Sequence, residues 1–135
     1  MIHVDEDGNI WAARALGLLR MIAAFLFMAH GGQKLFGFPA PMPNGMTLHL
    51  WSLVGVAGIL EFFGGLLLFI GLFTRPVAFI LSGQMAVAYC IGHARGGFWP
   101  TLNQGEFAVL YCFIFLYLSA AGGGAWSLDH MRQRR

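Results

Sequence analysis

Long apolar runs, interrupted by short groups of glycine, proline and charged residues, make up most of this chain. Four of these runs approach the length of a membrane-spanning helix, which needs about 20 residues, with a range of about 17 to 25. They cover roughly residues 11–36, 50–73, 76–92 and 106–121. The third and fourth runs lie at the short end of that range. The pattern predicts four helical crossings of a bilayer.

Proline marks the expected turns between these helices. The segment FPAPMP, residues 38–43, cannot continue a helix because proline lacks an amide hydrogen and clashes with the preceding turn. We expect a loop there, with residues 46–51 leading into the second helix. In GLFTRPVAF, Pro76 disfavours helical geometry at the residue before it and suits the first turn of the next helix. The predicted fold is therefore an all-α membrane protein, an antiparallel four-helix bundle.

The composition agrees with a membrane protein of a single domain, residues 1–135. Hydrophobic residues make up 58% of the chain and charged residues only 10%, whereas about a quarter of a soluble domain is charged. The opening MIHVDEDGN is acidic where a signal peptide is basic, so we expect a short polar tail before the first helix. The chain carries no nucleotide-binding loop, no Gly-x-Ser-x-Gly, no zinc pattern and no nucleic-acid-binding surface.

Basic residues near the helix ends predict the orientation, because Lys and Arg concentrate on the cytoplasmic side. With four crossings both termini share one side. Arg14, Arg75 and the basic tail of residues 129–135 lie on that side, whereas Lys34 and Arg95 lie on the other. Both termini are therefore predicted to be cytoplasmic. Membrane lipids are the first expected partner, and the tail is also suited to anionic headgroups.

Small residues gather on one face of the second predicted helix. At 100° per residue, Gly58, Gly64 and Gly65 cluster around Glu61. Small side chains let helix backbones approach closely where lipid supplies no hydrophobic drive for association. We expect this face to pack against protein, within the bundle or in a homo-oligomer.

Ionisable residues inside the bilayer are costly and suggest function. Counted from the cytoplasmic helix ends at 1.5 Å per residue, Arg20 and Gln84 lie roughly 12 Å deep and Glu61 roughly 18 Å deep. These three residues form a candidate buried polar centre. The alternative is that Arg20 and Glu61 are an ion pair that only sets helix register.

A second polar group is expected at the outer boundary. By the same count His30 and His93 lie roughly 26 to 27 Å from the inner ends of their helices, with Lys34 and Glu106 at the outer ends of theirs. Asn103, in the preceding loop, completes this candidate outer pocket. A simple interfacial ion pair between Lys34 and Glu106 is the alternative for those two residues.

The outer group suggests hydrogen-bonding and proton chemistry. A neutral imidazole can donate a hydrogen bond to a quinone carbonyl, and histidine with glutamate can relay a proton near neutral pH. No His-x-x-x-His or similar spacing supports a metal, so none is predicted. Cys90 and Cys112 fall at similar depths, but neither is in a Cys-x-x-Cys pair, and buried cysteine often acts as a small apolar filler.

Three segments together resemble the DoxX family of small bacterial inner-membrane proteins, over Ala13 to Asp129. They read RALGLLRMIAAFLFMAHGGQKLFGF, GILEFFGGLLLFIGLFTRPVAF and NQGEFAVLYCFIFLYLSAAGGGAWSLD. The resemblance implies a four-helix inner-membrane protein, related in name to the small subunit of a thiosulfate:quinone oxidoreductase and linked to sulfur and oxidative-stress complexes. The positions typical of the family are Arg20, His30, Gly31, Lys34, Glu61, Gly64, Gly65, Arg75, Asn103 and Glu106.

Three functions from different classes follow. The first is an inner-membrane subunit of a quinone-linked redox, sulfur or oxidative-stress assembly, with a quinone as the suggested cofactor. The second is a non-catalytic scaffold that docks a soluble oxidoreductase or sulfurtransferase through its cytoplasmic tail. The third is a small transporter or lipid-binding protein, for which four helices leave little room unless the protein oligomerises.

Overall fold

A computed structural model describes residues 6–43 and 49–135, with side chains from Ile10 onward. All regular structure in these ranges is helical, which confirms the predicted class. The polar tail was expected over residues 1–9, but residues 6–9 already belong to the first helix, and residues 1–5 lie outside the described residues. Residues 46–48 of the expected lead-in over residues 46–51 also lie outside the described residues.

Each of the four predicted helices is present. The first is α1 (Glu6–Phe36). The second is a continuous rod of α2 (Leu53–Ile59), the π-helical η2 (Leu60–Gly64) and α3 (Gly65–Ile70). The third joins α4 (Thr74–Ala88), the π-helical η3 (Tyr89–His93) and the 3₁₀ turn η4 (Ala94–Gly96). The fourth is α6 (Glu106–Ala121), and two short helices complete the order: α5 (Pro100–Asn103) and α7 (Leu128–Gln133).

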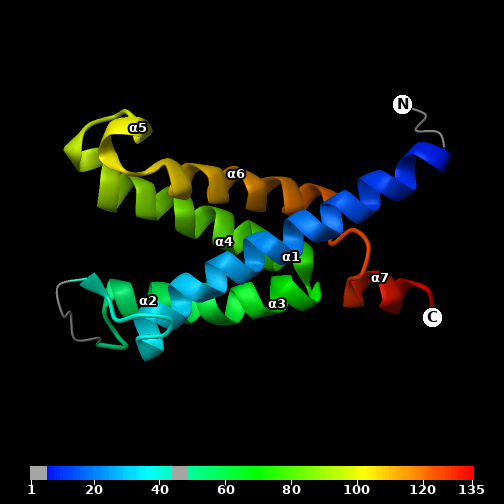
Figure 1. Cartoon of the computed structure of the whole chain (residues 1–135), viewed down its shortest axis with the longest axis horizontal. Coiled ribbons are helices and arrows are strands. Elements are labelled where there is room, and N and C mark those ends of the chain that lie inside the picture. The colour runs from blue at the N-terminus through cyan, green and yellow to red at the C-terminus, as the bar shows by residue number, and fades with distance from the viewer. Residues whose placement is uncertain (1–5, 44–48) are drawn as a thin grey trace.

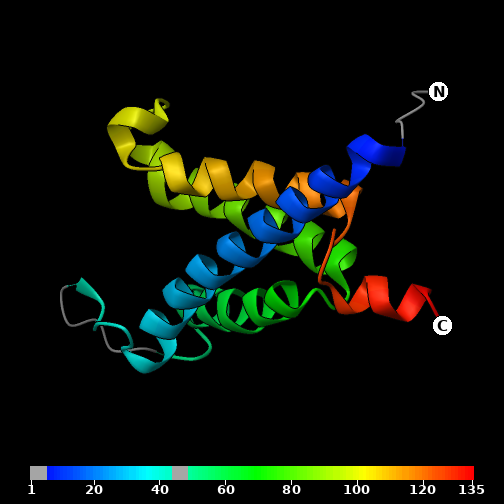
Figure 2. The same cartoon turned by 45° about the vertical axis from the view of Figure 1, so that its right-hand side comes forward.

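The long helices form two pairs. Helices α4 and α6 lie side by side, and α1 runs along the α2–η2–α3 rod (Figures 1 and 2). Helix α7 and the start of α1 lie at one end of the molecule, whereas α5 and the loop after α1 lie at the other (Figure 1). We call these the α7 end and the α5 end.

Local chemistry shifts the helix boundaries from those predicted. The second helix begins at Leu53, because the Ser52 hydroxyl accepts the Gly55 N–H at 3.1 Å, and it ends at Ile70, where Gly71 takes a left-handed φ of 73°. The third begins before Pro76, at Thr74. Helices α5 and α7 fall in regions for which the sequence pattern predicts only a loop and a tail.

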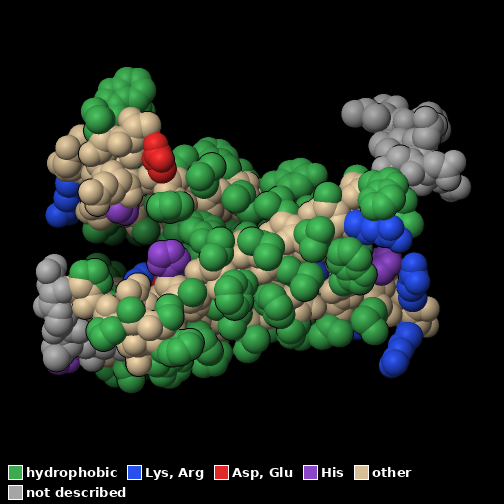
Figure 3. Space-filling view, viewed as in Figure 1, with side chains coloured by type: hydrophobic (Ala, Val, Ile, Leu, Met, Phe, Trp, Pro, Cys, Tyr) green, Lys and Arg blue, Asp and Glu red, His purple; other side chains and the backbone are tan. Residues whose placement is uncertain are grey.

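Polar and apolar residues are distributed in the opposite way to a soluble protein. Large apolar side chains cover the outside, and Leu53 and Phe79 are 76% and 64% exposed. Figure 3 shows apolar side chains along the length of the molecule and most Lys and Arg near its ends. Within residues 6–43 and 49–135, three helices are long and apolar enough to cross a membrane, whereas α6 is apolar but has 16 residues. An apolar exterior over hydrogen-bonded helices suits lipid as solvent.

Arg20 is fully buried at the α7 end, and its hydrogen bonds within the described residues go to backbone oxygens. Its Nη1 donates to the carbonyls of Leu68 and Phe69, both at 2.6 Å, near the end of α3. Its Nε donates to Gly123 at 2.8 Å, and its Nη2 donates to Ala125 and Trp126 at 3.3 and 3.1 Å. One guanidinium thus joins α1, α3 and the segment after α6.

Glycine lets α1 approach the second helix closely. A Cβ added at Gly31 would lie 2.4 Å from the Phe62 backbone nitrogen, and one at Gly65 would lie 2.6 Å from the Met28 side chain. Gly58 likewise faces Lys34 and Leu35, whereas Gly64 faces Leu81 on α4. The three glycines of the predicted packing face therefore lie at helix contacts.

Replacing Arg20 by Gln should destabilise the protein by at least about 3 kcal/mol, because several buried carbonyls would lose their donor. Chemical unfolding in detergent, followed by circular dichroism, measures this. The control is Arg14→Gln on the same helix, where the guanidinium stacks over the Trp11 ring at 5.0 Å. Equal stability of the two variants would contradict the anchoring role of Arg20.

Gly31→Ala should cost about 1 to 3 kcal/mol, because the new methyl group meets backbone that cannot move aside alone. Gly83→Ala on α4 is the matched control, since a Cβ there meets nothing within 4 Å. Both variants are compared in the same unfolding assay. The close approach of α1 is refuted if Gly31→Ala is as stable as Gly83→Ala.

Asp129 caps the start of α4 from a distant part of the chain. Its carboxylate accepts the N–H groups of Phe73 and Thr74 at 2.9 and 2.8 Å. Burial alone would raise the pKa of Asp129, but these donors, the Thr74 side chain and the Arg132 charge together lower the pKa below its ordinary 3.8. The resulting stabilisation is present above the unfolded-state pKa and is lost as pH falls through the lower folded-state pKa.

Asp129→Asn should therefore lower stability by about 1 kcal/mol at pH 7, the typical worth of a helix cap. Its stability should also fall less than that of the wild type when the pH is lowered below about 4. Unfolding at pH 7 and at pH 3 tests both points, with the exposed Glu106→Gln as control. Parallel losses of stability in Asp129→Asn and the wild type would count against this cap.

Candidate functional site

A groove of about 530 Å³ lies between the second and third helices, toward the α5 end. Figure 3 shows the molecule hollowed at this end between the two helix pairs, with histidine side chains on both sides of the hollow. The lining is mainly apolar, and its residues are Lys34, Leu53, Val54, Val56, Ala57, Leu60, Glu61, Ile80, Gly83, Gln84, Val87, Ala88, Ile91, Gly92 and His93.

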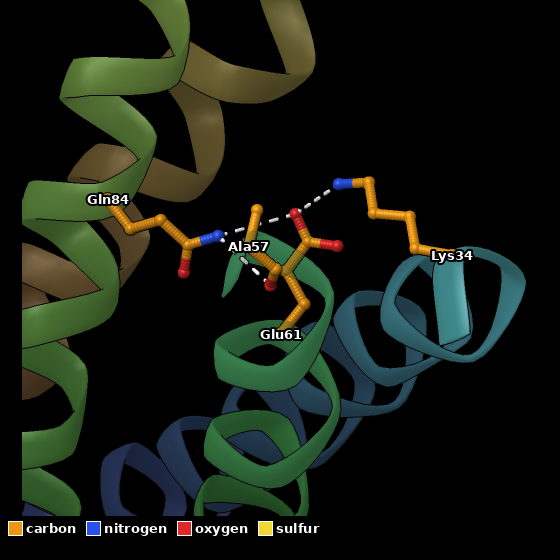
Figure 4. A network of polar contacts seen from close by, with 4 residues as sticks. All are labelled: Lys34, Ala57, Glu61 and Gln84. Atoms are coloured by element: carbon orange, nitrogen blue, oxygen red, sulfur yellow. Dashed lines mark hydrogen bonds and ion pairs between the residues drawn. The ribbon is translucent and has the colours of Figure 1, made fainter. Parts of the chain in front are cut away.

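Three polar side chains from three helices meet in this groove (Figure 4). Lys34 Nζ on α1 donates to Glu61 Oε1 on η2 at 2.6 Å. Gln84 Nε2 on α4 lies 3.4 Å from the same oxygen and 3.4 Å from the Ala57 carbonyl. The result is a Lys34–Glu61–Gln84 cluster centred on one carboxylate.

The helix contacts explain how Lys34 reaches Glu61. A Cβ at Gly58 would lie only 3.0 Å from the Lys34 Cβ, so glycine lets the lysine stem lie across α2. Glu61 follows three residues later, on nearly the same helix face. Its side chain is only 4% exposed, against 27% for Lys34. The carboxylate is thus buried and its cationic partner reaches it from the edge of the protein.

The cluster leaves two oxygens unused. Within the described residues, Glu61 Oε2 and Gln84 Oε1 are buried and have no hydrogen-bond partner. Most buried polar atoms are paired, so such an atom needs an explanation, for example an ordered water or a bound ligand.

His93 and His30 differ in their relation to the groove. His93 lines it, and its Nδ1 lies 3.1 Å from the Asn103 carbonyl. His30 is exposed on α1 and is not among the lining residues; its ring lies 6.3 Å from that of Tyr111. The groove therefore combines Lys34 and His93 of the predicted outer pocket with Glu61 and Gln84 of the predicted inner centre.

Like His30, three further predicted site residues lie outside the lining of the groove. Arg20 does not contact Glu61, because its donors are taken up by backbone carbonyls at the α7 end. Asn103 orders the loop before α6: its Nδ2 donates to the Gly97 carbonyl at 2.8 Å and its Oδ1 accepts the Gly105 N–H at 2.9 Å. Glu106 is exposed in the first turn of α6, and within the described residues the salt bridge of Lys34 is to Glu61 instead.

The site predicted from the sequence did not include the residues that form the apolar walls of the groove. Val87 and Ile91 on one wall and Val54 on the other look like ordinary lipid-facing residues in the sequence. A partial signal was available in Gly83 and Gly92, which leave open space on the same helix.

Among the described residues, the cysteines and histidines form no further centre. Cys90 and Cys112 are both free, and Cys112 Sγ lies 3.6 Å from the Ser82 hydroxyl. In the part of the chain that the structure describes, no three His, Cys, Asp or Glu side chains are grouped to hold a metal ion.

A larger hollow of about 610 Å³ lies at the α7 end, beside Gly122 to Ala125. Its main charged groups already have structural partners: Asp129 caps α4, Arg75 donates to the Ala120 carbonyl at 2.6 Å, and Arg132 lies over the Phe73 ring. We assign the candidate site to the groove, where a buried ion pair lies beside unpaired acceptors.

Comparison with known proteins gives the family. The sequence model of the DoxX family matches residues 15–94. An "Uncharacterized protein" of Haemophilus influenzae is 43% identical over 118 residues, covering 85% of this chain and 88% of the relative. The Bacillus subtilis protein named "Putative oxidoreductase CatD" is 27% identical over 113 residues, covering 83% of this chain and 82% of its own length. No solved structure matches the chain.

The family match covers more than half of the chain and includes most of α1, the whole second helix, α4 and η3, which carry Lys34, Glu61, Gln84 and His93. The chain belongs to the DoxX family of membrane proteins.

Proposed function

We propose that this protein is an integral inner-membrane subunit of a quinone-linked redox, sulfur or oxidative-stress assembly, and that the groove holds the quinone headgroup. In this proposal α6 completes a four-helix antiparallel bundle across the membrane, with both termini in the cytoplasm. The observation that carries the proposal is a groove with apolar walls and the Glu61–Gln84 pair at its base.

The groove suits a ligand that arrives from the lipid. Its rim includes the side chains of Val56, Ile80 and Val87, which are 44%, 56% and 56% exposed on the apolar surface of the molecule. A ligand with an apolar tail and a polar ring could enter sideways, leaving its tail among lipid chains. Small-molecule sites commonly combine apolar walls with a few well-placed polar groups.

The polar groups at the base match a quinone ring. The Lys34 ammonium has three N–H donors, one of which goes to Glu61, so a ring oxygen can accept another. On the opposite wall the Nδ1–H of His93 donates to the Asn103 carbonyl, so the Nε2 of the neutral ring can accept a hydrogen bond from a hydroxyl of the reduced ring. The name of the Bacillus subtilis relative supports the redox part of the proposal. The exposed basic residues of α7 suit docking of a soluble oxidoreductase or sulfurtransferase subunit.

Glu61→Gln should lower quinone affinity about tenfold or more, because it removes the charge that orders Lys34 and Gln84. Quinone is measured by extraction from gently purified protein and by titration with a short-chain quinone. Glu106→Gln, the same change at an exposed carboxylate, should bind as the wild type does.

A second variant tests the groove without removing a charge. Val87→Trp should fill the groove and displace quinone, whereas Phe79→Trp, on an exposed part of α4 outside the lining, should leave binding unchanged. If the wild type binds no quinone, or if Val87→Trp binds it as tightly as Phe79→Trp does, the proposed function is wrong.

A further inference from the structure

The unpaired oxygens of the cluster define what the ligand must offer. Glu61 Oε1 receives Lys34 Nζ and Gln84 Nε2, so the hydrogen bonds of this carboxylate end on one oxygen. Glu61 Oε2 and Gln84 Oε1 are buried without a partner among the described residues, and neither joins a dashed line in Figure 4. A buried acceptor with no donor costs free energy that a donating ligand would recover.

The orientation of the Gln84 amide is determined by its surroundings. Its Nε2 faces two acceptors, the Ala57 carbonyl and Glu61 Oε1, each at 3.4 Å. Turning the amide over would place its oxygen against these two oxygens and lose both contacts. The free atom is therefore the acceptor Oε1. Glu61, in an ion pair with the Lys34 ammonium, is likewise an acceptor at its second oxygen.

Both walls of the groove deviate from regular α-helix beside the cluster. Glu61 lies in the π-helical segment η2, and His93 lies in the π-helical segment η3. π-Helical segments are rare in proteins overall, but those that occur are often found at functional sites. Their occurrence on both sides of one groove is an observation independent of the unpaired oxygens, and it points to the same place.

Both side chains that carry the free oxygens line the groove, and the oxygens themselves are buried. The terminal torsions of Glu and Gln are broad, so a modest rotation can turn either oxygen toward a ligand. A quinone ring has only carbonyl acceptors and cannot satisfy these oxygens, whereas the two hydroxyls of a quinol can donate to them. Lys34 does not favour either form, because a hydroxyl oxygen accepts a hydrogen bond as a carbonyl does.

We propose that the groove selects the reduced, hydroxyl-bearing form of its ligand, a quinol or similar dihydroxy aromatic lipid, through hydrogen bonds to Glu61 Oε2 and Gln84 Oε1. This inference rests on the proposed function and adds the redox form of the ligand. The site then binds the quinol more tightly than it binds the quinone, so it favours uptake of the reduced carrier from the bilayer.

The test compares decylubiquinol with decylubiquinone, which share a tail and ring substituents and differ in redox state. Full-length protein in detergent is titrated with each under anaerobic conditions by calorimetry. The quinol should bind about tenfold more tightly. Gln84→Met, similar in size but without the amide acceptor, should reduce this preference severalfold, while Gln33→Met on α1, outside the lining, should retain it.

The outcomes separate this inference from the proposed function. Binding of neither form refutes both. Quinone binding as tight as quinol binding, or tighter, overturns the selectivity and leaves the proposed function standing. A quinol preference that Gln84→Met does not reduce overturns the assignment of the acceptors. Circular dichroism of each variant before titration ensures that only folded protein is compared.

Discussion

The buried guanidinium of Arg20 is the interaction on which the arrangement of the helices depends. A charge in an apolar interior needs partners, and within the described residues the five hydrogen bonds of this group go to backbone carbonyls rather than to a carboxylate. Two of these carbonyls, of Leu68 and Phe69, lie at the carboxyl end of α3, where the helix dipole is negative. These hydrogen bonds offset the cost of burying the Arg20 charge. It also holds three distant segments together.

This anchoring at the α7 end contrasts with the hollow at the α5 end. At the α7 end, Arg20 and Asp129 join the helix pairs through the segment after α6. Toward the α5 end the pairs are joined less tightly, and the groove lies between them with Glu61 and Gln84 at its base. Arg20 and Asp129, the charged groups that fasten the α7 end, are hydrogen-bonded. Glu61 Oε2 and Gln84 Oε1 in the groove are instead buried acceptors without a partner among the described residues. The apolar walls beside these acceptors are why we place ligand binding in the groove.

Lipid as solvent explains why so few residues carry the chemistry. The exterior must be apolar, so the informative side chains are those that face inward. Membership of the DoxX family is consistent with this plan, and the family match covers the helices that build the groove. The proposed quinone site uses a single ion pair, one amide and one imidazole, each held by a different part of the helical frame. Glycine contacts set the positions of these side chains.

Much of the fold could be predicted from the sequence, because helix length and apolar composition are local properties and because proline and glycine end helices locally. The four long helices and their approximate ends follow from these rules, and so does the inward placement of Arg20 and Glu61. The hydrogen-bond partner of each buried polar side chain could not be predicted in this way. A rise of 1.5 Å per residue gives depth along a helix, but the rotation and crossing of neighbouring helices come from packing. Only the tertiary structure decided that Glu61 pairs with Lys34 through the space left by Gly58, and that Arg20 bonds backbone instead.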